Sequence, residues 1–178
     1  FGALDTEVGF YDQGGAGIAP PVSLGALTLD AAMAVDATGG FAVWTGSELA
    51  GVTFDFESGV GAPTTLAAVG SERPKLARTA NSALAIYQAT ATDAWHSVAV
   101  DLAADPPSAA PPSGPLTLTH VAEVAATDNG WMIAGEAPSS QGLDVAVLTG
   151  NAPALASPAV ISVRRNRQQR ASLVPTAT

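Results

Sequence analysis

An internal repeat of short, strand-like segments limits the folds open to this chain. Four segments start with valine and share one pattern: Val8-Gly-Phe-Tyr-Asp12, Val52-Thr-Phe-Asp-Phe56, Val98-Ala-Val-Asp-Leu102 and Val145-Ala-Val-Leu-Thr149. The leading valines, at positions 8, 52, 98 and 145, are 44, 46 and 47 residues apart. In the second segment Val52, Phe54 and Phe56 alternate with polar residues, and this period of two predicts a β-strand with one buried face.

Further strand-like runs accompany each of these segments. A run that opens on proline follows each one: Pro21-Val-Ser-Leu24, Pro63-Thr-Thr-Leu66, Pro115-Leu-Thr-Leu118 and Pro158-Ala-Val-Ile161. A predicted hairpin precedes three of the valine-led segments: Met33-Ala-Val-Asp36 with Phe41-Ala-Val-Trp44, Leu76-Ala-Arg-Thr79 with Leu84-Ala-Ile-Tyr87, and Val124-Ala-Ala-Thr127 with Trp131-Met-Ile133. Proline suits the first residue of an edge strand, and the Gly, Asn and Asp residues between the hairpin strands accept the positive φ of tight turns.

Four strands in each unit of about 45 residues are typical of a β-propeller blade. We therefore predict an all-β fold of about four four-stranded blade repeats, forming one β-propeller segment over residues 1–178. The approximate repeats are residues 1–29, 30–70, 71–119 and 120–163. Residues 164–178 then enter the next blade or close the ring, since Ala171-Ser-Leu-Val-Pro175 matches the register of an innermost strand. We favour a window on a larger propeller, because the first repeat lacks part of a blade.

Composition restricts the function classes. Charged residues make up only 13% of the chain and hydrophobic ones 47%, which argues against disorder. The absence of cysteine excludes disulfides and thiolate metal sites, and no apolar run approaches the roughly 20 residues of a membrane helix. A net charge of −9 argues against nucleic acid as the main partner.

A ligand face is expected where loops join the second to the third strand of a blade and one blade to the next. These loops bring eight candidate residues to one rim: Glu48, Arg73, Asp93, Trp95, His96, His120, Glu136 and Arg167. Glu136 with Asp93 could act as general acid and base on a glycoside, although acidic loop residues are more often plain surface. His96 and His120 are too few for a typical zinc site, so we predict no metal and no cofactor.

The three tryptophans have a simpler interpretation. Trp95 beside His96 could form a platform that stacks on sugars, but it begins a strand, and filling the space between blades is the more common role. Trp44 and Trp131 lie within strands and are predicted to be core, as is Phe54.

Val35-Asp36-Ala37-Thr38-Gly39-Gly40-Phe41-Ala42-Val43-Trp44 resembles a repeat of exported bacterial propeller proteins, in which an Asp-x-x-Gly turn leads into a strand ending in Val-x-Trp. Pro74-Lys-Leu-Ala77 is similar to the entry of the same repeat. Thr127-Asp128-Asn129-Gly130-Trp131 more distantly resembles the Asp-box of sialidase-like propellers, but its Trp follows the Gly directly. The resemblance implies export to the cell surface, the periplasm or the outside, with a binding or scaffolding role. It carries over no catalytic residue.

The leading functional hypothesis is therefore a non-enzymatic propeller module of an exported bacterial protein that presents a face to a protein partner or to the rest of its own propeller. The first alternative is a carbohydrate-binding or glycan-cleaving propeller, and the second is a structural subunit of a large assembly. Neither a nucleophile elbow nor a phosphate-binding glycine loop is present in the sequence, but propeller hydrolases build their sites from scattered loops.

Overall fold

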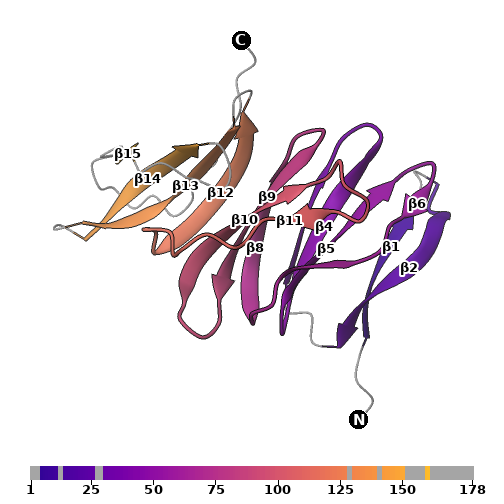
Figure 1. The fold of residues 1–178 in the computed structure, drawn as a ribbon, viewed down its shortest axis with the longest axis horizontal. Coiled ribbons are helices and arrows are strands. Elements are labelled where there is room, and N and C mark those ends of the chain that lie inside the picture. Colours follow the sequence, from indigo (N-terminus) through magenta and orange to yellow (C-terminus); the bar gives the residue numbers. More distant parts are fainter. Residues whose placement is uncertain are drawn as a thin grey trace.

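The fold is built from antiparallel sheets. The computed structural model describes residues 5–11, 14–26, 30–127, 130–139, 142–150 and 159–160. These residues form fifteen strands and no helix, so the predicted all-β class is confirmed for the described part of the chain, which offers no membrane-spanning helix. The strands make four sheets, none of them closed, which follow one another in a row in chain order (Figure 1).

The first two sheets contain the strands up to residue 67. The N-terminal sheet pairs β1 (Asp5–Tyr11) with β2 (Gly17–Ala26). The next sheet runs from β3 (Asp30–Val35) through β4 (Gly39–Thr45) to β5 (Leu49–Asp55). The short strands β6 (Gly59–Val60) and β7 (Thr64–Ala67) both pair with β5, so the outer edge of this sheet is divided between two pieces.

The other two sheets each have four strands in sequential order. One consists of β8 (Ser71–Arg78), β9 (Ser82–Ala89), β10 (Ala94–Asp101) and β11 (Ser108–Ala109). The other consists of β12 (His120–Thr127), β13 (Gly130–Ser139), β14 (Gly142–Gly150) and β15 (Ala159–Val160). The four valine-led segments of the repeat begin in strands β1, β5, β10 and β14, as predicted. Phe56 and Leu102 lie just past the ends of β5 and β10, and Asp12 lies outside the described residues.

One predicted strand is wrong. Pro115-Leu-Thr-Leu118 is not a strand; β11 takes that place seven residues earlier, and residues 110–116 then follow the outer edge of β10. Their contact with β10 is a widely spaced set of hydrogen bonds: Ala110 N to Ala99 O, Ser113 N to Ser97 O and Leu116 N to Trp95 O. Prolines 111, 112 and 115 have no N–H to donate, so a continuous ladder cannot form here.

The core lies between neighbouring sheets, because each strand sends alternate side chains to opposite faces. Phe41 and Val43 of β4 pack with Ala85 and Tyr87 of β9 in one buried cluster. On the other face of β9, Leu84 and Ile86 pack in a second cluster with Trp95, Val121, Trp131 and Ile133. The first strands are also neighbours, since β8 lies against β3 on one side and β12 on the other.

A third cluster occupies the face of the β3–β7 sheet that points away from β8. It contains Ala42, Trp44, Ala50, Val52 and Phe54. Trp44 is 7% exposed and Phe54 6%, so the prediction that both are buried is confirmed.

Candidate functional site

The turns and linkers at one end of the sheets lie along one edge, which we call the linker rim (residues 46–48, 68–73, 90–93 and 117–120). Backbone hydrogen bonds join the first three of these segments: Ser71 N donates to Gly46 O at 3.0 Å, and Thr90 N donates to Gly70 O at 3.0 Å. Gly70 permits this approach, since a Cβ there would lie 2.7 Å from the Thr90 hydroxyl oxygen. The rim is thus held by the chain itself across the boundary between two sheets.

Arg73 and Asp93 belong to one polar group on this rim. Arg73 Nη1 donates to Gln88 Oε1 at 3.1 Å, and Gln88 Nε2 donates to the Asp93 carbonyl oxygen at 2.9 Å. Both flanking residues have positive φ, 52° for Arg73 and 55° for Asp93, and Arg73 sits in a bulge of β8. Gln88 is buried, and its side-chain amide fixes the positions of the Arg73 guanidinium and of the turn at Asp93. Both of these residues remain exposed.

Trp95, His120 and Glu136 form a second group. The Trp95 indole N–H donates to Thr119 O at 3.3 Å, and the His120 ring stands edge-on to the indole with centroids 6.1 Å apart. His120 faces Glu136 across the β12–β13 pair. Trp95 is only 1% exposed, so it fills space between two sheets, the more common of its two predicted roles, and offers no free face to a sugar.

Glu48 and His96 lie apart from these groups. Glu48 Oε2 accepts a hydrogen bond of 3.0 Å from the Thr65 hydroxyl. His96 lies further along β10, where its Nδ1 is 2.8 Å from the Ser113 carbonyl oxygen; this oxygen can only accept, so Nδ1 carries the proton. One face of the imidazole is closed by Tyr87, stacked at 5.6 Å, and burial raises the pKa of that tyrosine. Arg167 lies outside the described residues.

The structure therefore brings the candidates together in pairs and triplets rather than in one constellation. Asp93 lies in the turn before β10 and Glu136 lies on β13 of the next sheet, and no described contact joins them. Among the described residues there is also no group of three or more histidines and carboxylates that could hold a metal ion.

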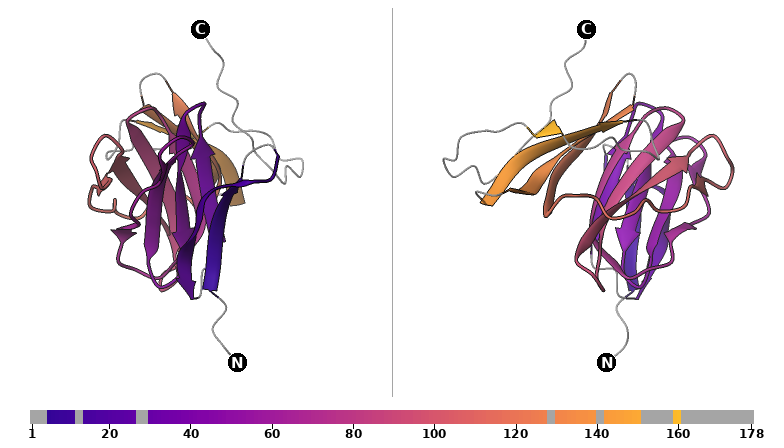
Figure 2. Two further views of the ribbon diagram at one scale, coloured as in Figure 1. Left: turned by 90° about the vertical axis from the view of Figure 1, so that its right-hand side faces the viewer. Right: turned by 60° about the vertical axis from the view of Figure 1, so that its left-hand side comes forward.

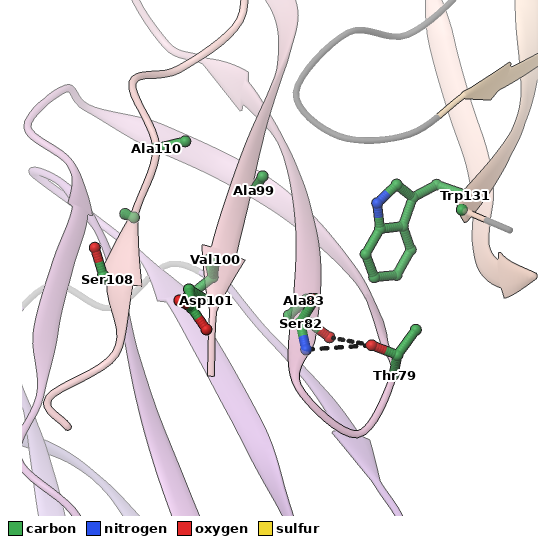
Figure 3. Close-up of a pocket in the computed structure, with 11 residues that line it drawn as sticks. Thr79, Ser82, Ala83, Ala99, Val100, Asp101, Ser108, Ala110 and Trp131 are labelled. Atoms are coloured by element: carbon green, nitrogen blue, oxygen red, sulfur yellow. Dashed lines mark hydrogen bonds between the residues drawn. The ribbon is translucent and has the colours of Figure 1, made fainter. Parts of the chain in front are cut away.

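Sequence reasoning missed a pocket of about 490 Å³ at the opposite end of the sheets (Figure 3). It opens between β9–β11 and the start of β13. Its lining combines small residues with four polar side chains and one indole: Thr79, Ser82, Ala83, Ala99, Val100, Asp101, Ser108, Ala109, Ala110, Gly130 and Trp131. The run of alanines and serines was the available signal, since small side chains on facing strands leave space between sheets.

The hairpin turns at this opposite end explain the Asp-x-x-Gly motif. Asp36 Oδ1 accepts hydrogen bonds from Thr38 N at 2.9 Å, the Thr38 hydroxyl at 2.8 Å and Gly39 N at 3.1 Å. Asp36 Oδ2 pairs with Arg78 Nη2 of the next sheet at 3.0 Å. The Thr38 amide, followed by its hydroxyl and the Gly39 amide, holds the pKa of Asp36 below its ordinary 3.8. Asp36 therefore stabilises both the turn between β3 and β4 and the junction between two sheets.

No protein-family model, curated protein or solved structure matches the chain.

Proposed function

We propose that the chain is part of a β-propeller and works as a non-enzymatic binding or scaffold module, with the linker rim as the face that meets a protein partner. Support for the propeller comes from the order of the sheets. The three sheets from β3 onward are built of consecutive strands and pack face to face through two buried clusters. Their first strands β3, β8 and β12 are neighbours, as they are around a propeller axis.

The observation that carries the binding role is the construction of the rim. Backbone hydrogen bonds link three of its segments across the boundary between two sheets, while Arg73, Asp93 and His120 stay exposed on it. A rigid backbone that displays side chains of both charges loses little entropy on association, and complementary charges favour one partner over others. Such a surface suits recognition of another folded protein.

The proposal of an exported bacterial protein rests on the repeat motif. The Asp36 turn has the hydrogen bonds that an Asp-x-x-Gly hairpin requires, which supports the interpretation of this motif as a structural turn. The cell surface, the periplasm and the extracellular space are the compartments that follow from that resemblance.

Site-specific photo-crosslinking tests the rim. A photoreactive amino acid replaces Glu48 or Asp93 on the rim in one pair of variants, and the exposed Ala80 or Asn81 at the opposite end in the control pair. Each variant is mixed with the cell-surface and secreted fractions of the organism that makes the protein. We expect one discrete adduct from both rim variants and none from the controls.

Two results would overturn this proposal. Adducts that form equally at both ends would show that the rim is no special face. Turnover of chromogenic glycosides that is abolished by Glu136→Gln would make the chain an enzyme, with the carboxylate beside His120 as its acid or base.

A further inference from the structure

The pocket between β9–β11 and the start of β13 has a row of polar side chains on one wall (Figure 3). Asp101 on β10 pairs with Ser82 on β9 and, on its other side, with Ser108 on β11. Residues that pair directly in antiparallel strands point to the same face of the sheet, and neighbouring strands are about 4.8 Å apart. The two hydroxyls therefore flank the carboxylate in a row across the sheet.

Apolar groups lie behind this polar row. Leu84 and Ala99 pair with each other two residues further along β9 and β10, so they share the same face. Leu84 packs with Trp131 of β13 in one buried cluster, which shows that this face is turned toward the next sheet. The methyl groups of Ala99 and Ala110 line the pocket together with the Trp131 indole. The pocket thus has a polar row beside an apolar interior.

The space exists because the two sheets diverge. Their first strands, β8 and β12, lie against each other, and in the right-hand view of Figure 2 the sheets separate toward their outer strands. Short side chains on β10 and on the segment after β11 leave this widening gap unfilled. Its volume of about 490 Å³ falls within the range of small-molecule sites, about 300–1,000 Å³.

The pocket has a negative charge that no base of the protein neutralises. Among the described residues that line it, Asp101 is the only one with an ionisable side chain. Neither of the two ion pairs in the described part of the chain includes this carboxylate. Its Oδ1 accepts a hydrogen bond from the Ala103 amide at 2.9 Å, which helps to fix its orientation. The site is therefore complementary to a cation.

We propose that this pocket binds a small organic cation, a primary ammonium group attached to a compact apolar body. An ammonium group has three N–H donors and no acceptor, and the polar row offers it one carboxylate and two hydroxyl oxygens. The apolar body lies against the two alanine methyl groups and the indole, where its burial removes apolar surface from water.

A saccharide fits this arrangement less well. Its hydroxyl groups surround the whole ring, so those that face Ala99, Ala110 and Trp131 would be buried without hydrogen-bond partners. The proposed cation site lies at the end of the sheets opposite to the linker rim, and it does not depend on the role of that rim.

A matched pair of probes tests the need for a positive charge: phenethylamine and its neutral counterpart, phenethyl alcohol. Each is titrated into the full chain and followed by the backbone amide signals in NMR spectra. Signals of Ser82, Asp101 and Gly130 should shift, and the affinity for phenethylamine should be at least about tenfold higher, because only the amine forms a charge-assisted hydrogen bond with the carboxylate.

Two pairs of variants locate the binding. Asp101→Asn removes the charge but keeps an oxygen that can accept the Ala103 amide hydrogen. It should lower the affinity for phenethylamine at least about tenfold and leave that for phenethyl alcohol unchanged. Asp105→Asn is its control, since Asp105 is an exposed carboxylate on the same loop that does not line the pocket. Ala99→Leu, which fills the pocket, should abolish binding of both probes, whereas Ala91→Leu, at an exposed rim position, should not.

The proposal fails on any of three results, provided that circular dichroism and thermal unfolding show folded variants. The first is that the wild type binds neither probe or binds both equally. The second is an equal effect of Asp101→Asn and Asp105→Asn on phenethylamine binding. The third is tighter binding of methyl β-glucoside than of phenethylamine at the same amides, since a saccharide would then be the occupant. None of these titrations involves the linker rim, so a failed rim proposal is distinguishable from a failed cation site.

Discussion

Phe54→Ala is the sharpest test of how the sheets pack. The Phe54 side chain is 6% exposed, and its ring lies so close to Gly40 on β4 that a Cβ on that glycine would collide with it. Trp44 and Val52 complete the surrounding cluster. Because backbone forms one wall of this site, little can move to fill the space left by the ring, and the free energy of unfolding should fall by about 3–5 kcal/mol.

Reversible urea unfolding measures this loss, with an unchanged m value as the condition for comparing midpoints. Phe56→Ala is the matched control two residues along the chain. The Phe56 ring centroid is 5.9 Å from that of Phe54, but Phe56 is 41% exposed and lies in the turn after β5. Its loss should stay below about 1 kcal/mol. A Phe54→Ala loss under about 1 kcal/mol, or one equal to that of the control, would show that the inward face of β5 is assigned wrongly.

Substitutions at Gly135, Trp95 and Asp36 probe other parts of the structure. Gly135→Ala should lower the free energy of unfolding by about 1–3 kcal/mol, because its Cβ would collide with a carbonyl oxygen of β12, whereas Gly114→Ala, which meets nothing within 4 Å, should be neutral in the same urea assay. Trp95→Phe should cost about 0.5–1.5 kcal/mol for the lost indole hydrogen bond and Trp95→Ala several times more; equal losses would contradict its packing role. Folding lowers the pKa of Asp36, so its carboxylate stabilises the fold above pH 3.8, and this stabilisation is lost as the pH falls through the lower pKa of the folded state. In an acid titration, the free energy of unfolding of Asp36→Asn should therefore fall less steeply than that of the wild type.

The positions of the strands could be predicted from the sequence because alternation and spacing are local properties. Val52 and Val98 each lead a segment that pairs on both sides as an inner strand of its sheet. The fourth strand of the third repeat could not be placed in this way. Proline runs mark both edge strands and irregular linkers, and only the hydrogen bonds from Ala110 and Ser113 to β10 show that the proline-rich segment here is a linker.

The candidate site was predictable only in outline. The alternation of strands and turns is sufficient to assign residues to the linker rim, but not to decide which rim residues touch. His120 faces Glu136 because the β12–β13 register shifts between Val121 and Glu123. No local sequence pattern predicts this shift. The burial of Trp95 likewise depends on the distance between two sheets, a tertiary quantity.

The hairpin turns show why spacing was a better guide to the repeat than the motif. Before β4, the Asp36 carboxylate accepts the amide hydrogens of the turn; before β9, at the same place in the hairpin, the Thr79 hydroxyl accepts the Ser82 amide at 3.2 Å. The physical requirement is an oxygen that satisfies the turn amides, and either side chain provides one. A search for Asp-x-x-Gly finds only the first of these hairpins. The strand period finds both, because burial between sheets fixes where strands must recur and leaves the turn chemistry free to vary.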